Sequence, residues 1–141
     1  MVACRVTPDA GATMPSVRSA VSRFAPPLLL MALIFFLSAQ PDLNSGLGTL
    51  DTVLRKLAHM AEFGLLWWLW WRALGVRHAP AAVAITLVYA ASDELHQHFV
   101  DGRHGSVLDW CIDAAGVGLA GLAVVLHARL RRARATAGAA R

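Results

Sequence analysis

The chain has 141 residues, of which 57% are hydrophobic and 16% are charged, and its formal net charge is +4 at pH 7. This composition is too apolar for an ordinary small soluble domain and too regularly patterned for a disordered chain. The length favours one compact unit, and the two cysteines, Cys4 and Cys111, do not make a disulfide framework.

Four hydrophobic stretches follow one another, at residues 24–39, 57–74, 80–99 and 107–127. Each is close to the length of about 20 residues that crosses a bilayer as a helix, although the first is short. A soluble four-helix bundle would have a polar face on every helix, whereas residues 26–39 and 114–126 contain no charge. The sequence therefore predicts an all-α fold, an integral membrane four-helix bundle.

Three parts are expected along the chain: a flexible tail over 1–22, a transmembrane domain over 23–128 and a basic cytoplasmic tail over 129–141, which we expect to be disordered. The first stretch also has features of a cleaved signal peptide, because Arg18 and Arg23 precede it and Ser38-Ala39-Gln40 ends it. We predict that it is retained, since four spans give a consistent charge pattern. Residues 40–46 form a turn cluster, and the amphipathic segment 47–57 is expected to lie along the outer interface.

Basic residues indicate the orientation. They gather before the first stretch, between the second and third, and at the C-terminus: Arg5, Arg18, Arg23, Arg72, Arg77, Arg129, Arg131, Arg132 and Arg134. The positive-inside rule places all three groups in the cytoplasm. We therefore predict a multi-pass protein of the cytoplasmic membrane with both termini inside. The expected partner of the basic charge is the lipid bilayer, not nucleic acid.

Two patterns concern packing. Trp67, Trp68, Trp70 and Trp71 stand just before Arg72 and predict an aromatic belt at the cytoplasmic boundary, with ligand stacking as the alternative. The small residues Gly116 and Ala120 predict a close approach of the fourth helix to a neighbour.

The third stretch ends in a polar run, Ser92-Asp93-Glu94-Leu95-His96-Gln97-His98-Phe99, after twelve residues without charge. Ionisable groups at the bilayer centre cost several kcal/mol each, about 2.5–3.5 on insertion scales. Lys56, His59 and Glu62 share a broad face at the start of the second helix, and Asp109 and Asp113 are four residues apart in the fourth. With four spans, all these groups fall in the outer half. The predicted outward-facing polar pocket comprises Lys56, His59, Glu62, Asp93, Glu94, His96, Gln97, Arg103, Asp109 and Asp113.

Several motifs resemble the VanZ-like family. They are Ser38-Ala39-Gln40-Pro41, Lys56-x-x-His59-x-x-Glu62-Phe63-x-x-Leu66, Ser92-Asp93-Glu94-x-His96-Gln97-x-Phe99, Gly102-Arg103-x-x-Ser106-x-x-Asp109 and Asp113-x-x-Gly116. The resemblance covers about residues 36–121, and it departs at Asp113, where the family usually has asparagine. It implies a cell-envelope function, linked in the family to lowered susceptibility to the glycopeptide teicoplanin, but it names no reaction.

Three hypotheses for the polar residues stay open. The leading one is a module that binds or transports an envelope or glycopeptide ligand, because carboxylates this close together hold protons or a cation. A carrier of four short helices would be expected to be a homodimer. The structural alternative is that ion pairs such as Lys56 with an aspartate, Arg103–Asp109 and His–Glu lock the helices together.

The third hypothesis is a membrane-embedded enzyme acting on a lipid-linked or phosphorylated envelope substrate. Lys56 and Arg103 would hold a phosphate or carboxylate. His59 or His96 would be the general acid or base, oriented by Glu94 or Asp93. A variant of this hypothesis has a zinc or manganese ion on His59, Glu62, Asp93, Glu94 and His96. The sequence names no cofactor and does not decide whether the protein is an enzyme.

Overall fold

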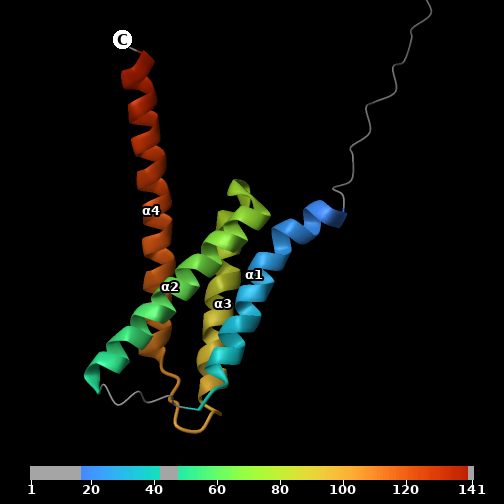
Figure 1. Ribbon diagram of the computed structural model, residues 1–141, viewed down its shortest axis with the longest axis vertical. Helices are drawn as coiled ribbons and strands as arrows, with labels where there is room; N and C mark the ends of the chain where they lie inside the picture. The colour runs from blue at the N-terminus through green and yellow to red at the C-terminus, as the bar shows by residue number, and fades with distance from the viewer. Residues whose placement is uncertain (1–16, 42–47, 140–141) are drawn as a thin grey trace, which may run out of the picture.

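The structure is a computed structural model that describes residues 17–41 and 48–139, which form four α-helices, one short 3-10 helix and no strand. The helices are α1 (Val17–Ser38), α2 (Thr49–Leu74), α3 (Ala79–Gln97) and α4 (Val107–Ala139), and the 3-10 helix η1 (Val76–His78) joins α2 to α3 (Figure 1). The prediction of an all-α fold with four helices is confirmed.

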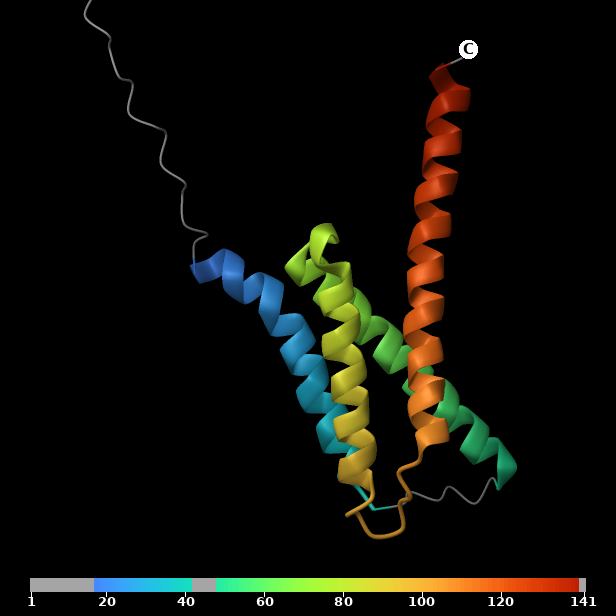
Figure 2. The ribbon, with the colours of Figure 1, turned by 180° about the vertical axis from the view of Figure 1, so that it is seen from behind.

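Successive helices run in opposite directions (Figures 1 and 2). The helix α2 packs against the other three, most extensively against α4, and α3 also packs against α1 and α4. The end of α1, the start of α2, the end of α3 and the start of α4 therefore meet at one end of the bundle. We call this the polar end and define it as residues 38–41, 48–62 and 93–113; η1 lies at the opposite end.

Helix boundaries differ from the expected ones at three places. The first helix begins at Val17, so residues 17–22 are helical and do not belong to a flexible tail. The second begins at Thr49, so most of the expected interfacial segment 47–57 is the first part of α2. The remaining expected tail, residues 1–16, and residues 42–46 of the expected turn cluster lie outside the described residues.

The fourth helix is the longest and continues to Ala139, so the expectation of disorder from Arg129 onward is wrong. Alanine and arginine are strong helix formers, and a helix that is already nucleated by packing extends through them without further contacts. In both ribbon views the C-terminal part of α4 projects beyond the other helices (Figures 1 and 2).

The apolar core lies between the helices away from the polar end. Phe63 and Leu66 of α2, Ile34 of α1 and Ala90 of α3 are fully buried in it. Trp67 is also buried there and stacks on Trp71 with ring centroids 5.9 Å apart. Trp67 therefore packs inside the bundle and is not an anchor at the boundary, in contrast to the sequence-based expectation for this residue.

A close approach of α2 and α4 fixes the geometry of the polar end. A Cβ atom on Gly116 would lie 2.2 Å from the carbonyl oxygen of Met60, and one on Gly64 would lie 2.9 Å from the carbonyl oxygen of Gly116. Only residues without a Cβ allow the two backbones to come so close. The predicted close approach at Gly116 is confirmed, and it sets the first turns of α4 beside those of α2.

Two helices, α1 and α4, are long and apolar enough to cross a membrane. Only 11% of the apolar window of α1 and 17% of that of α4 are buried inside the structure, whereas the core helix of a soluble protein would be mostly buried. Large side chains such as Leu29, Phe36, Leu119 and Leu122 are exposed on these helices. Apolar surface of this extent is typical of contact with lipid.

Candidate functional site

A cavity of about 310 Å³ lies at the polar end, between α2, α3, α4 and the loop that joins the last two helices. Seven of the ten residues predicted to form a polar pocket line it: Lys56, His59, Glu94, Gln97, Arg103, Asp109 and Asp113. These residues come from three helices and one loop, so the antiparallel order of the helices assembles the site.

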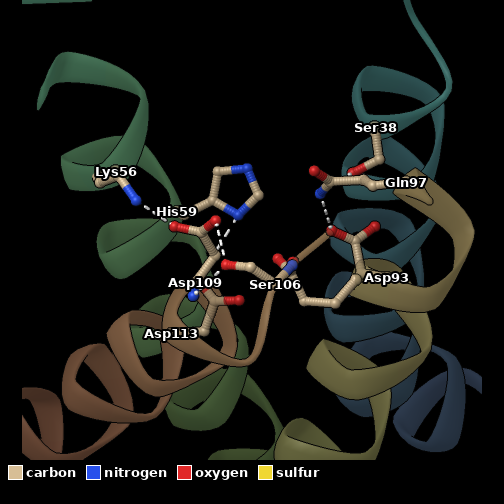
Figure 3. A network of polar contacts seen from close by, with 9 residues as sticks. Ser38, Lys56, His59, Asp93, Gln97, Ser106, Asp109 and Asp113 are labelled. Atoms are coloured by element: carbon tan, nitrogen blue, oxygen red, sulfur yellow. Dashed lines mark hydrogen bonds and ion pairs between the residues drawn. The ribbon is translucent and has the colours of Figure 1, made fainter. Parts of the chain in front are cut away.

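Lys56 and Asp109 join α2 to α4 at this cavity. The Lys56 ammonium donates a hydrogen bond to one oxygen of Asp109, and the Ser106 hydroxyl donates to the other at 2.7 Å. The backbone N–H of Asp109 donates in turn to the Ser106 hydroxyl at 3.1 Å, so Ser106 caps the start of α4 (Figure 3). Both carboxylate oxygens of Asp109 are therefore used. The pairing of Lys56 with an aspartate, expected under the structural hypothesis, is present.

One turn further along both helices, His59 faces Asp113. Nδ1 of His59 and Oδ1 of Asp113 are 3.5 Å apart, with 17% and 1% of the respective side chains exposed. This contact is an ion pair by distance but lacks hydrogen-bond geometry. Neither oxygen of Asp113 nor Nδ1 of His59 has a hydrogen-bond partner among the described residues. Figure 3 shows the two side chains pointing toward each other from neighbouring helices.

Glu94 reaches the same place from the end of α3. Its Oε2 accepts a hydrogen bond from the backbone N–H of Ser106 at 2.7 Å, while its buried Oε1 has no hydrogen-bond partner in the described part of the chain. A Cβ atom on Gly105 would lie 1.9 Å from the Glu94 carbonyl oxygen. The absence of a side chain at Gly105 therefore lets the loop press against the last turn of α3 and hold Glu94.

One nitrogen or oxygen atom from each of His59, Glu94 and Asp113 lies within 4.8 Å of the other two. We call these three residues the triad. Imidazole and carboxylate groups that converge in this way are able to hold a metal ion, to share a proton, or to bind a cationic group of a ligand.

The other three predicted pocket residues do not line the cavity. Asp93 accepts a hydrogen bond from the Gln97 side-chain amide at 2.8 Å, and the same amide lies 3.3 Å from the Ser38 hydroxyl of α1. His96 stacks on Phe35 of α1 with centroids 4.5 Å apart. Glu62 is half-buried on α2. Gln97 and His96 thus contact α1, whereas Glu62 belongs neither to the cavity lining nor to this contact between α3 and α1.

Arg103 ties the loop to the end of α1. Its guanidinium donates hydrogen bonds to the carbonyl oxygens of Gln40 at 2.9 Å and Leu37 at 3.0 Å. These oxygens lie in the last turn of α1 and just after it, where carbonyl groups lack the i+4 partners of a continuing helix. The contacts of Arg103 therefore include a structural one, besides its place at the edge of the cavity.

Residues 48–55 also contribute to the cavity, although none of them is among the ten predicted pocket residues. Asp51, Thr52 and Arg55 line it, and Arg55 pairs with Asp51 at 2.9 Å. The spacing of Thr52, Lys56 and His59 would have predicted this contribution, because residues three or four apart share one face of a helix. The spacing has this meaning only if the second helix begins before residue 57, and it begins at Thr49.

The comparisons with known proteins agree with these motifs. The family model described as VanZ/LLP1 matches residues 23–128, which is most of the chain. No curated protein and no solved structure matches it. Together with the two apolar helices, the family indicates a membrane protein. The chain belongs to the VanZ/LLP1 family.

Proposed function

We propose that this protein is a multi-pass protein of the cytoplasmic membrane that binds or transports a polar, envelope-related ligand in an outward-facing cavity at its polar end. Both termini would lie in the cytoplasm. The antiparallel order of the four helices supports this topology. So does the position of Arg72 and Arg77, which lie near η1 at the end opposite to the cavity.

The observation that carries the proposal is the cavity itself. It combines two ion pairs, Arg55 with Asp51 and Lys56 with Asp109, with the carboxylates of Glu94 and Asp113 from α3 and α4. Buried charges that lack hydrogen-bond partners cost free energy, so a protein retains them where a ligand compensates that cost. A ligand with both an anionic and a cationic group fits this mixture of charges.

The size of the cavity limits the ligand. A volume of about 310 Å³ is at the lower end of ligand sites, which span about 300–1,000 Å³. It suits a headgroup or a short polar segment rather than an entire glycopeptide. An effect on teicoplanin susceptibility would therefore arise through an envelope component that the cavity holds.

A membrane-embedded enzyme is the second candidate, and the contact between His59 and Asp113 favours it. A histidine that faces a buried carboxylate is an arrangement used for general acid–base catalysis. The substrate would be a lipid-linked or phosphorylated envelope compound. The Ser106 hydroxyl donates to the Asp109 carboxylate and accepts from the Asp109 N–H, so its observed role is that of a helix cap.

The topology is tested by labelling single cysteines in intact cells. Cys4 and Cys111 are replaced by serine, and cysteine is introduced by Asp101→Cys in the α3–α4 loop or by Arg77→Cys in η1. A membrane-impermeant maleimide should label the first variant in intact cells and the second only after lysis. The opposite pattern would overturn the proposed orientation.

Ligand binding is tested on the detergent-purified protein with a lipid-linked peptidoglycan precursor as the probe. The melting temperature of the wild type should rise with the probe. The rise should shrink for Lys56→Gln, in the cavity, and persist for Arg77→Gln, which removes an exposed cation at the opposite end. Turnover of the probe would favour the enzyme, and the absence of both a shift and turnover would count against the proposal for this ligand class.

A further inference from the structure

We propose that the triad of His59, Glu94 and Asp113 is a binding site for one divalent transition metal ion, with zinc or manganese as the best-matched ions. Each residue offers one ligand atom, and the three atoms lie within 4.8 Å of one another. The inference concerns the same cavity as the proposed function but does not depend on the envelope ligand.

Asp113 is the strongest indication that the site takes a further positive partner besides the facing His59. Its side chain is 1% exposed, and neither carboxylate oxygen has a hydrogen-bond partner among the described residues. A buried carboxylate of a native protein is normally paired, hydrogen-bonded or bound to a metal. Oε1 of Glu94 and Nδ1 of His59 are likewise buried without a hydrogen bond in the described chain. Each of the three residues thus has a buried atom without a hydrogen bond, and one ligand atom of each lies within 4.8 Å of the other two.

The spacing of these atoms fits ligands of a common ion. Two ligands on one tetrahedral zinc, each about 2.0–2.1 Å from it, are about 3.3 Å apart. Nδ1 of His59 and Oδ1 of Asp113 are 3.5 Å apart, which is long for a hydrogen bond but close to that separation. The ligand atom of Glu94 lies within 4.8 Å of both of the other ligand atoms.

Neighbouring residues hold the triad in the way that outer groups hold metal ligands. The Ser106 N–H donates to Oε2 of Glu94, which fixes the carboxylate and leaves Oε1 without a hydrogen bond in the described chain. Lys56 and Ser106 occupy both oxygens of Asp109. This nearby carboxylate is therefore neutralised and stays outside the ligand set.

The donor types indicate the class of ion. Imidazole nitrogen is a ligand for zinc, manganese, iron and other transition metals, whereas calcium and magnesium prefer oxygen alone. The triad also lines the cavity. An ion with three protein ligands would therefore keep an open position toward the cavity, where water or a ligand could bind.

The test is metal binding by the full chain in detergent after removal of metal with EDTA. We expect one zinc or manganese ion per chain by elemental analysis, and a higher melting temperature when the ion is added. Glu94→Gln and His59→Gln should each weaken binding by at least about tenfold, as even changes next to metal ligands do. Glu62→Gln is the matched control, because it removes a half-buried carboxylate near His59 that is not part of the triad.

Two results would overturn the proposal. One is a wild-type protein that binds neither ion above the level of the two triad variants. The other is equal weakening by Glu62→Gln, which would mean that a general negative field, and not ligation, attracts the ion. Melting curves without metal show that each variant is folded. The two proposals can fail separately. If no metal binds but the protein still binds the lipid-linked probe, the metal site is refuted and the proposed function stands. If metal binds but the probe does not, the reverse holds.

Discussion

The polar end and the apolar core are built from the same helices but follow opposite rules. In the core, Phe63, Leu66 and Ile34 belong to one buried apolar cluster, and their side chains have no polar atoms that need hydrogen bonds. At the polar end, Asp113 and Glu94 are also buried but keep oxygen atoms without hydrogen-bond partners in the described chain. The core thus stabilises the bundle, whereas the polar end carries a local cost that a bound partner would offset.

In an apolar chain, the buried polar groups that lack hydrogen-bond partners indicate where a ligand or ion binds. Charged groups that complete each other, such as Lys56 with Asp109, hold helices together and can be understood without a ligand. Groups that remain incomplete within the fold, such as the triad, point to something that is absent from the chain. The predictions below test the contrast, from the largest expected effect to the smallest.

Phe63→Ala should destabilise the protein most. Phe63 is fully buried in the core, and a phenylalanine-to-alanine change in a core costs about 3–5 kcal/mol through lost contacts and a residual cavity. The free energy of unfolding in mixed detergent should fall by this order. Phe36→Ala, at an exposed position of α1, is the control and should change little. Equal losses would mean that the core and the lipid-facing surface do not differ as described.

Gly116→Ala should cost less, about 1–3 kcal/mol, because the new methyl group would meet the Met60 carbonyl oxygen and push α4 away from α2. The same change at Gly118, on the same helix with open space around it, should stabilise by about 0.5–1 kcal/mol through helix propensity. Thermal unfolding of the two variants measures the difference. If both behaved alike, the close helix contact would not support the site.

Glu94→Gln should have the smallest effect and the opposite sign. Glutamine keeps an oxygen for the Ser106 N–H but removes a buried charge from a group of carboxylates. The metal-free variant should be more stable than wild type by about 1 kcal/mol, as measured by its melting temperature. A clear loss of stability would instead support the structural hypothesis, in which the charge of Glu94 locks the helices. Asp101→Asn, on the exposed loop, serves as the control and should be neutral.

The sequence predicted most of the fold because apolar runs and turn residues carry the signal for helices directly. The start of α2 and the end of α4 were predicted less well, because the sequence there mixes apolar and charged residues. Thr49 to Lys56 contains both apolar and charged residues, so its continuation into α2 was not foreseen. The Arg-rich segment after residue 128 has a disordered-looking composition, yet helix propensity carries α4 through it.

For the site, the sequence alone determined which polar residues gather at one end, because alternating helix directions leave few other arrangements. Only the tertiary structure decided their roles, since these depend on side-chain directions and on close contacts between helices. It turned Gln97 and His96 toward α1, directed Arg103 to the end of that helix, and set Asp113 against His59 through the contact at Gly116. Periodicity specifies a face of a helix, but the distance between facing atoms is set by packing, and that distance separates a completed pair from a triad with free ligand atoms.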